Sequence, residues 1–259
     1  AFLSPLIKQN KSIGFVPTMG ALHQGHLSLL EKSLSENDLT VMSIFVNPTQ
    51  FNNAEDLDKY PRTLERDVQI MQDLSNNIIV YAPEVADIYE GNTVSESFNY
   101  DGLENQMEGK HRPGHFDGVG TIVKRLFEIV QPNKAYFGEK DFQQLQIVKK
   151  LVSKHNIPVE VIGCQIHREA NGLAMSSRNE RLSESAREKA AVIYQILNTA
   201  KDFFQSHSAE ETTTFVEKEF KKHQEFELEY FEIADEATLL PVSEKESNKK
   251  YRGFIAIFI

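Results

Sequence analysis

Short apolar runs alternate along the chain with stretches in which apolar residues recur every three or four positions. The short runs predict buried β-strands at 13–16, 40–46, 78–81, 135–137 and 159–164. The stretches between them predict amphipathic helices at 25–35, 63–74, 119–130 and 142–155. Strands that alternate with helices in this way are typical of a parallel sheet covered by helices, so the sequence predicts an α/β fold.

The pattern changes after Cys164. Asn171-Gly172 is a hairpin signal, and a charged amphipathic helix is predicted from about residue 185 to residue 204. The remainder predicts a second helix at 210–223 and strands at 228–234 and 254–259. We therefore expect two domains: an α/β domain with a parallel sheet over 1–166, and a smaller α+β C-terminal lid domain over 167–259.

Composition narrows the class of protein. The 259 residues are 40% hydrophobic and 25% charged, which is ordinary for a soluble globular protein. The net charge is -10 and no stretch concentrates basic residues with aromatics, so we expect no nucleic-acid binding. No run of about 18 apolar residues is present, so we expect no membrane segment. The single Cys164 fits a reducing, cytoplasmic compartment, and its place in an apolar run favours buried packing over catalysis.

The turn after the first strand carries the clearest chemical signal. Gly20 and Gly25 flank the start of a helix whose first turn holds His23 and His26. A helix N-terminus attracts anions through its unpaired N–H groups, and glycine lets a ligand approach the backbone. Two imidazoles there could donate hydrogen bonds to a polyphosphate, although a helix start with two surface histidines is the plainer alternative. The P-loop and GxGxxG patterns are absent.

The other polar candidates also follow predicted strands. They lie in segments 17–26, 47–51 and 138–144. Because ligands in such folds bind at the carboxyl ends of the strands, we expect these segments to share one cleft.

Four segments together carry a resemblance to a known family. They are the histidine turn, Ser43–Phe51, Phe137–Gln144 and Ala174–Asn179. In order and spacing they closely resemble the pantoate-beta-alanine ligases, members of the nucleotidylyltransferase superfamily with the HIGH motif, over residues 13–182. The resemblance implies a Rossmann-like, nucleotide-binding fold for the domain over 1–166. It also implies a cytoplasmic homodimer that joins pantoate to β-alanine through a pantoyl adenylate, consuming ATP with Mg²⁺.

The resemblance implies catalytic roles for His23, His26, Lys140 and Arg178, with His26 as a proton donor. Pantoate is already ionised at pH 7, so its attack on ATP needs alignment and charge neutralisation and no general base. Lys140 suits this as a cation at a strand end, although a surface lysine in an ion pair is the alternative. Asp141 could bind ribose, orient Lys140 or cap the next helix.

The second predicted domain contributes Ser176, Ser177 and Arg178, which resemble a mobile phosphate-binding loop that clamps the leaving pyrophosphate. A loop of this kind can exclude water from the acyl adenylate. Without the other motifs the same residues would be a loop cap. The full ATP site implied by the resemblance is Met19, Gly20, His23, Gly25, His26, Gly138, Glu139, Lys140, Asp141, His167, Met175, Ser176, Ser177 and Arg178.

Two amides, Gln50 and Gln144, suit the hydroxyls and carboxylate of pantoate. The resemblance also places Tyr60, Arg112 and His115 around the pantoate and β-alanine pocket, where sequence alone gives a pre-helix turn and a basic loop. His167 departs from the family pattern, which has an apolar residue beside adenine; it could stack on the base or contribute only its backbone.

Three other functions remain as alternatives. A nucleotidylyltransferase that passes AMP or CMP to a phosphorylated acceptor would need extra cations where this chain has two glutamines. A truncated aminoacyl-tRNA synthetase is disfavoured by the acidic composition and the missing anticodon-binding extension. A catalytically inactive nucleotide-binding protein is disfavoured because both histidines, Lys140 and Arg178 are present.

Overall fold

The structure is a computed structural model that describes residues 11–89 and 91–259. The chain divides into two compact units, and each is described by itself. The first comprises Ala1–Glu104 and His111–His167, and the second comprises Asn105–Lys110 and Arg168–Ile259. The second unit thus includes a short internal segment that the sequence pattern did not separate from the first.

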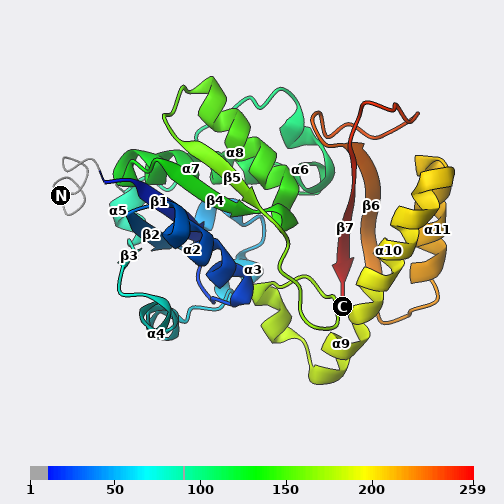
Figure 1. Ribbon diagram of the computed structural model, residues 1–259, viewed down its shortest axis with the longest axis horizontal. Helices are drawn as coiled ribbons and strands as arrows, with labels where there is room; N and C mark the ends of the chain where they lie inside the picture. Colours follow the sequence, from blue (N-terminus) through cyan, green and yellow to red (C-terminus); the bar gives the residue numbers. More distant parts are fainter. Residues whose placement is uncertain (1–10, 90) are drawn as a thin grey trace. The chain divides into compact units, whose positions relative to one another are not determined.

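The first unit is built on a five-stranded parallel sheet with strand order β3-β2-β1-β4-β5 (Figure 1). The strands are β1 (Ile13–Thr18), β2 (Leu39–Ile44), β3 (Ile78–Tyr81), β4 (Lys134–Gly138) and β5 (Glu160–Cys164). Each lies within two residues of its predicted bounds, and the α/β prediction is confirmed. The chain runs outward from β1 to β3 and then returns to place β4 on the other side of β1.

Helices cover both faces of this sheet (Figure 1). On one face, Val16 and Met42 of the sheet pack in one core cluster with Leu30 of α2 (Gln24–Glu36) and Met71 of α4 (Leu64–Leu74). On the other face, Phe15 meets Phe127 edge to face, with ring centroids 6.1 Å apart. The helices on this second face include α7 (His115–Val130) and α8 (Phe142–Lys154).

Several short elements were not predicted. They are α3 (Ala54–Asp58), α5 (Val85–Tyr89), α6 (Met107–His111) and the 3-10 turns η1 (Pro48–Gln50), η2 (Leu103–Asn105), η3 (Glu139–Asp141) and η4 (Ser177–Arg181). Each has at most five residues, which is too short for a repeat of three or four positions to be recognised.

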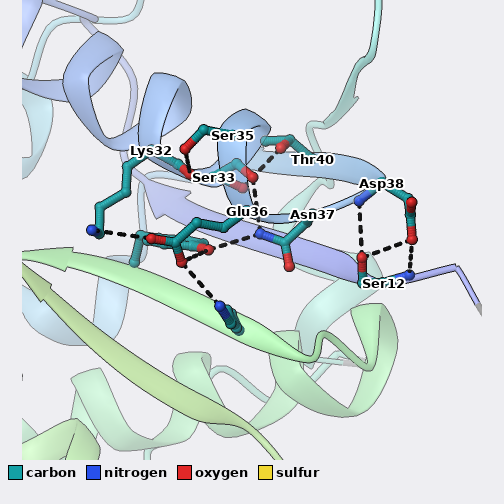
Figure 2. A network of polar contacts seen from close by, with 10 residues as sticks. Ser12, Lys32, Ser33, Ser35, Glu36, Asn37, Asp38 and Thr40 are labelled. Carbon is teal, nitrogen blue, oxygen red and sulfur yellow. Dashed lines mark hydrogen bonds and ion pairs between the residues drawn. The ribbon is translucent and has the colours of Figure 1, made fainter.

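A polar network closes the end of the sheet where the strands begin (Figure 2). Ser12 and Asp38, each just before a strand, bond to one another through side chains and backbone. Glu36, the last residue of α2, pairs with Lys32 at 3.1 Å and with Lys134, the first residue of β4, at 3.0 Å. The hydrogen bond from Lys134 is the largest cause that lowers the pKa of Glu36 to about 2.

Gly14 allows the end of α2 to approach β1 very closely. A Cβ at this position would lie 2.1 Å from the Ser33 hydroxyl and 2.6 Å from the Asn37 amide nitrogen. Both groups form hydrogen bonds within the unit. The Ser33 hydroxyl bonds to the Thr40 hydroxyl at 2.8 Å, and the Asn37 amide donates to the Ser33 carbonyl at 2.9 Å. The C-terminal end of α2 is therefore fixed where the strands begin, and its N-terminal end lies where β1 ends.

The second unit has a two-stranded antiparallel sheet, β6 (Glu227–Asp235) and β7 (Tyr251–Phe258), with a core that includes Ile196, Val216, Phe231 and Ile233. Its helices are α9 (Glu184–Lys189), α10 (Ala191–Ser206) and α11 (Ala209–Phe220). One continuous helix was predicted over 185–204, and this was wrong. The backbone tightens at Ala190, whose N–H bonds to the carbonyls of both Ala186 and Glu188.

No helix among the described residues is both long and apolar enough to cross a membrane.

Truncating Leu30 tests the packing of α2. Leu30 is fully buried in the core cluster, so Leu30→Ala should lower the free energy of unfolding of the first unit by about 2–5 kcal/mol. The matched control is Leu64→Ala, because Leu64 is 46% exposed. Urea unfolding followed by circular dichroism gives both values, and equal midpoints for the two variants would contradict this packing.

Candidate active site

The candidate site lies at the carboxyl ends of three adjacent strands. The histidine turn follows β1, the segment with Lys140 follows β4, and the segment with Gln50 follows β2. The chain reverses its direction of travel across the sheet between β1 and β4. Open parallel sheets bind ligands at such a switch point. The three segments thus lie at the same end of the sheet, and one cleft shared by all of them stays a prediction.

The loop from β1 into α2 has an unusual backbone. Gly20 and Ala21 both have positive φ, at 89° and 52°. The Thr18 hydroxyl accepts a hydrogen bond from the Gly20 N–H at 2.6 Å. The chain therefore turns sharply enough for His23 to become the N-cap of α2.

His23 and His26 cap the helix reciprocally. The Nδ1 atom of His23 accepts from the Gly25 N–H at 3.1 Å, and the Nδ1 atom of His26 accepts from the His23 N–H at 3.3 Å. An Nδ1 atom that accepts carries no proton, so a neutral ring has its proton on Nε2. The rings lie side by side with centroids 4.1 Å apart, and both tautomers are set by the backbone.

His26 stays neutral at physiological pH. As a whole residue it is only partly buried, but its ring is withdrawn from water. That desolvation, followed by the neighbouring His23, lowers the pKa of His26 from 6.5 to about 3. The ring can therefore donate a hydrogen bond while it keeps its proton.

Lys140 and Asp141 are near this histidine pair. The charge of Asp141 raises the pKa of His26 and that of Lys140 lowers it, so both act electrostatically on the ring. Lys140 Nζ lies 3.0 Å from an oxygen of Asp141, in an exposed ion pair. Asp141 is the N-cap of α8 but makes no side-chain cap hydrogen bond, which favours orientation of Lys140 over helix capping. A Cβ on Gly138 would meet nothing within 4 Å, so the backbone there is open.

A buried polar network holds the turn that carries Gln50. The Asn47 side chain donates to the Gly118 carbonyl at 3.1 Å and accepts from the Tyr89 hydroxyl at 2.5 Å. A Cβ on Gly118 would lie 2.3 Å from the Thr49 carbonyl oxygen, so α7 packs directly on this turn. Gln50 is thus fixed through its backbone, and its side chain is partly exposed.

His115 lies behind Gln50. Its Nδ1 atom is 2.9 Å from the Gln50 carbonyl oxygen, and the residue is buried. Tyr60 is also buried and packs edge to face on Phe51, with centroids 5.7 Å apart. Arg112 and Gln144 are partly exposed, and Gln144 lies in the first turn of α8. Direct ligand contact by these residues stays a prediction.

The remaining predicted residues lie after β5. His167 is exposed at the end of the first unit. Met175, Ser176, Ser177 and Arg178 belong to the second unit, where the Ser176 hydroxyl caps η4 by accepting from the Arg178 N–H at 3.3 Å. Ser177 is buried and Arg178 is exposed.

Within the second unit, Glu169 anchors this serine segment. Its carboxylate accepts two hydrogen bonds from Arg187, each of 2.8 Å, and one from the Asn179 amide at 3.0 Å. Asn179 also donates to the Ala174 carbonyl at 3.0 Å. The predicted hairpin at 171–172 is present as a tight turn, in which Gly172 has a φ of 92° and Arg168 pairs with Ala174.

Sequence reasoning missed three residues that shape these segments: Asn47, Asp67 and Glu169. Asn47 and Asp67 are completely buried polar side chains with hydrogen bonds to backbone groups far away in the sequence. Asn47 could have been noticed because it opens a candidate segment. Asp67 carried no signal, since an acidic residue in the first turn of a helix is commonplace.

No group of three or more histidine, cysteine, aspartate and glutamate side chains arranged to hold a metal ion is present in the part of the chain that the structure describes.

Comparison with known proteins identifies close relatives. A family model described as pantoate-beta-alanine ligase matches residues 1–259. The pantothenate synthetase of Flavobacterium psychrophilum is 66% identical over 258 residues, which cover 100% of this chain and 92% of the relative. That of Bacteroides thetaiotaomicron is 48% identical, covering 100% of this chain and 91% of the relative.

Solved structures agree with these sequences. The crystal structure of pantothenate synthetase from Thermus thermophilus is similar with a TM-score of 0.86 and 41% identity, covering 95% of this chain and 92% of that one. The ligase from Francisella tularensis, solved in complex with β,γ-ATP and β-alanine, has a TM-score of 0.76 and 36% identity, covering 97% and 90%.

The lowered pKa of His26 gives a direct prediction. Its ring should show no titration from about pH 5 upward, in the Nε2-protonated tautomer. Because the folded state binds this proton more weakly than the unfolded state, the stability it contributes is present above about pH 6.5 and declines as the pH falls toward 3.

Histidine-labelled NMR measures this titration. The His26→Asn variant identifies the resonance by its disappearance. An inflection of that resonance between about pH 6 and 7, the range of an ordinary imidazole, would contradict the burial argument.

Proposed function

The chain belongs to the pantoate-beta-alanine ligase family, and from that premise we propose that His23, His26 and Lys140 bind and polarise the phosphates of ATP. The enzyme joins pantoate and β-alanine to form pantothenate at the expense of ATP. The pantoate carboxylate attacks the α-phosphorus and pyrophosphate leaves. The amine of β-alanine then attacks the carbonyl carbon of pantoyl adenylate, and AMP leaves.

The reciprocal histidine cap is the observation that carries the proposal. Because both Nδ1 atoms accept hydrogen bonds, each ring has an Nε2–H donor at the N-terminus of α2. The helix dipole favours negative charge at the same place. Neutral donors at a helix N-terminus suit a polyphosphate whose charge changes during reaction.

Catalysis of the first step depends on alignment and charge. Pantoate arrives as a carboxylate, so no base is needed to activate it. Lys140 supplies a full positive charge and Asp141 restrains its ammonium group. With its pKa lowered, His26 acts as a hydrogen-bond donor to phosphate oxygens in this proposal, and the proton-donor role that the family resemblance implies stays a prediction.

Gln50 and Gln144 bind pantoate in this proposal. An amide offers both a donor and an acceptor, which matches two hydroxyls and a carboxylate. The hydrogen bond between His115 and the Gln50 carbonyl supports an indirect role for His115, which positions the glutamine. We assign Tyr60 and Arg112 to the same pantoate and β-alanine pocket.

The segment Met175–Arg178 of the second unit binds the pyrophosphate end of ATP in this proposal. Serine hydroxyls and a guanidinium can follow the leaving group as its charge develops. A lid of this kind protects the adenylate from hydrolysis. The remaining nucleotide contacts come from Met19, Gly20, Gly25, Gly138, Glu139 and His167.

Mg²⁺ enters as the ATP complex. A magnesium ion prefers phosphate and water oxygens, which the substrate supplies, so it needs no dedicated protein cage. The family resemblance further favours a homodimer in the cytoplasm.

Pyrophosphate exchange tests the function and its residues together. The enzyme should incorporate labelled pyrophosphate into ATP only when pantoate is present, and should release AMP only when β-alanine is added. Exchange with a phosphorylated acceptor in place of pantoate would move the protein to the nucleotidylyltransferase class.

In the same assay, His26→Asn and Lys140→Met should each lower exchange by at least about a hundredfold, because each removes a preorganised partner of the phosphates.

The control for Lys140→Met is Lys149→Met, which removes an exposed lysine from α8. Circular dichroism should show all these variants folded. Full exchange activity in both His26→Asn and Lys140→Met would exclude the proposed phosphate site.

The pantoate site has a charge test of its own. Gln144→Glu places a carboxylate against the substrate carboxylate, so the KM for pantoate should rise at least about tenfold while the KM for ATP changes little. The control is Gln146→Glu, which adds the same charge two residues along α8 and hence on another side of the helix. An equal rise in both KM values would show that Gln144 does not bind pantoate specifically.

A further inference from the structure

We propose that Asp67 is the positioning residue of the nucleotide loop: a buried carboxylate on α4 that holds residues 20–23 in the conformation that presents the two histidines. This inference rests on the proposed phosphate-binding role of His23 and His26. Asp67 acts through the loop and touches no substrate in the proposal.

The Asp67 carboxylate is completely buried and uses both of its oxygens. One oxygen accepts from the Leu22 N–H at 2.9 Å, and the other accepts from the Ala21 N–H, also at 2.9 Å. The second oxygen also accepts from the Thr63 hydroxyl at 3.1 Å. Two consecutive backbone donors therefore meet one side chain from a helix 45 residues further along the chain.

Only a carboxylate fits this arrangement. An amide of the same shape would accept from one N–H and direct its own NH₂ group at the other. Burial of a charge is unfavourable, but three hydrogen bonds and a place in the first turn of α4, near the positive end of the helix dipole, offset it. The side chain thus joins two consecutive backbone N–H groups of the loop to α4.

One of the two residues that Asp67 bonds has an unfavourable backbone conformation. Ala21, like Gly20 before it, lies in the left-handed region, and for alanine that conformation is disfavoured. His23 follows two residues later as the N-cap of α2. If Ala21 relaxed to an ordinary φ, the direction of the chain into His23 would change and the reciprocal bonds between the histidines would be lost.

The test compares Asp67→Asn with Asp73→Asn. Asp73 lies on the same helix but is exposed, so the chemical change is matched. In pantoate-dependent pyrophosphate exchange, measured well below the unfolding midpoint of each variant, Asp67→Asn should raise the KM for ATP roughly ten- to hundredfold, since it leaves buried donors unsatisfied. The KM for pantoate should stay within about twofold, and Asp73→Asn should behave as the parent.

A purely structural role would give another result. It would lower the unfolding midpoint and the folded fraction but leave the KM for ATP unchanged, and that outcome overturns the proposal. Histidine NMR adds a second readout, because the His23 and His26 signals should shift in Asp67→Asn and not in Asp73→Asn.

If Asp67→Asn does not fold, the variant Thr63→Val tests the proposal in its place. It removes one of the three donors and leaves both backbone bonds, so the KM for ATP should rise severalfold in a folded protein. An unchanged value overturns the proposal. Loss of exchange in His26→Asn with normal kinetics in Asp67→Asn would reject this inference alone, whereas full exchange in both His26→Asn and Lys140→Met would reject the proposed function.

Discussion

The close packing of α2 on β1 is the constraint on which the site depends. Gly14 leaves no Cβ, so Ser33 and Asn37 lie directly on the strand, and Glu36 pairs with Lys134 at the start of β4. With its C-terminal end fixed in this way, the helix must direct its N-terminal end over the carboxyl ends of β1 and β4. The polar network in Figure 2 fixes the end of α2 that is opposite to the two histidines, and so limits where the helix can place them.

The sequence predicted the sheet well because its strands are short apolar runs bounded by turns, and a strand buried on both faces needs no other signal. It also predicted the histidine turn and the segments after β2 and β4, since strand ends are readable from the same pattern. The break at Ala190 between α9 and α10 was not predictable, because no glycine or proline marks it and the apolar repeat continues through it.

Burial explains what the sequence could not predict in the site. Asp67 and Asn47 form hydrogen bonds to backbone groups 45 and 71 residues away along the chain. No local sequence pattern indicates such a partner. His115 was grouped with the ligand-binding residues, and the structure adds a contact between its Nδ1 atom and the Gln50 carbonyl that no pattern indicated. A side chain that positions another is indistinguishable in sequence from one that binds the substrate.

The neutral state of His26 has a mechanistic consequence. A fixed cation binds ATP strongly before the reaction and binds pyrophosphate strongly after it, so it lowers the barrier only where its attraction grows in the transition state. A neutral N–H donor attracts the ground state less and strengthens as charge moves onto the bridging oxygen. In the proposed function, one lysine beside a carboxylate and a neutral His26 ring oriented by a backbone hydrogen bond therefore favour the transition state over tight binding of either ligand. The same burial that lowers the pKa of His26 makes this difference larger, because electrostatic interactions are stronger where water is excluded.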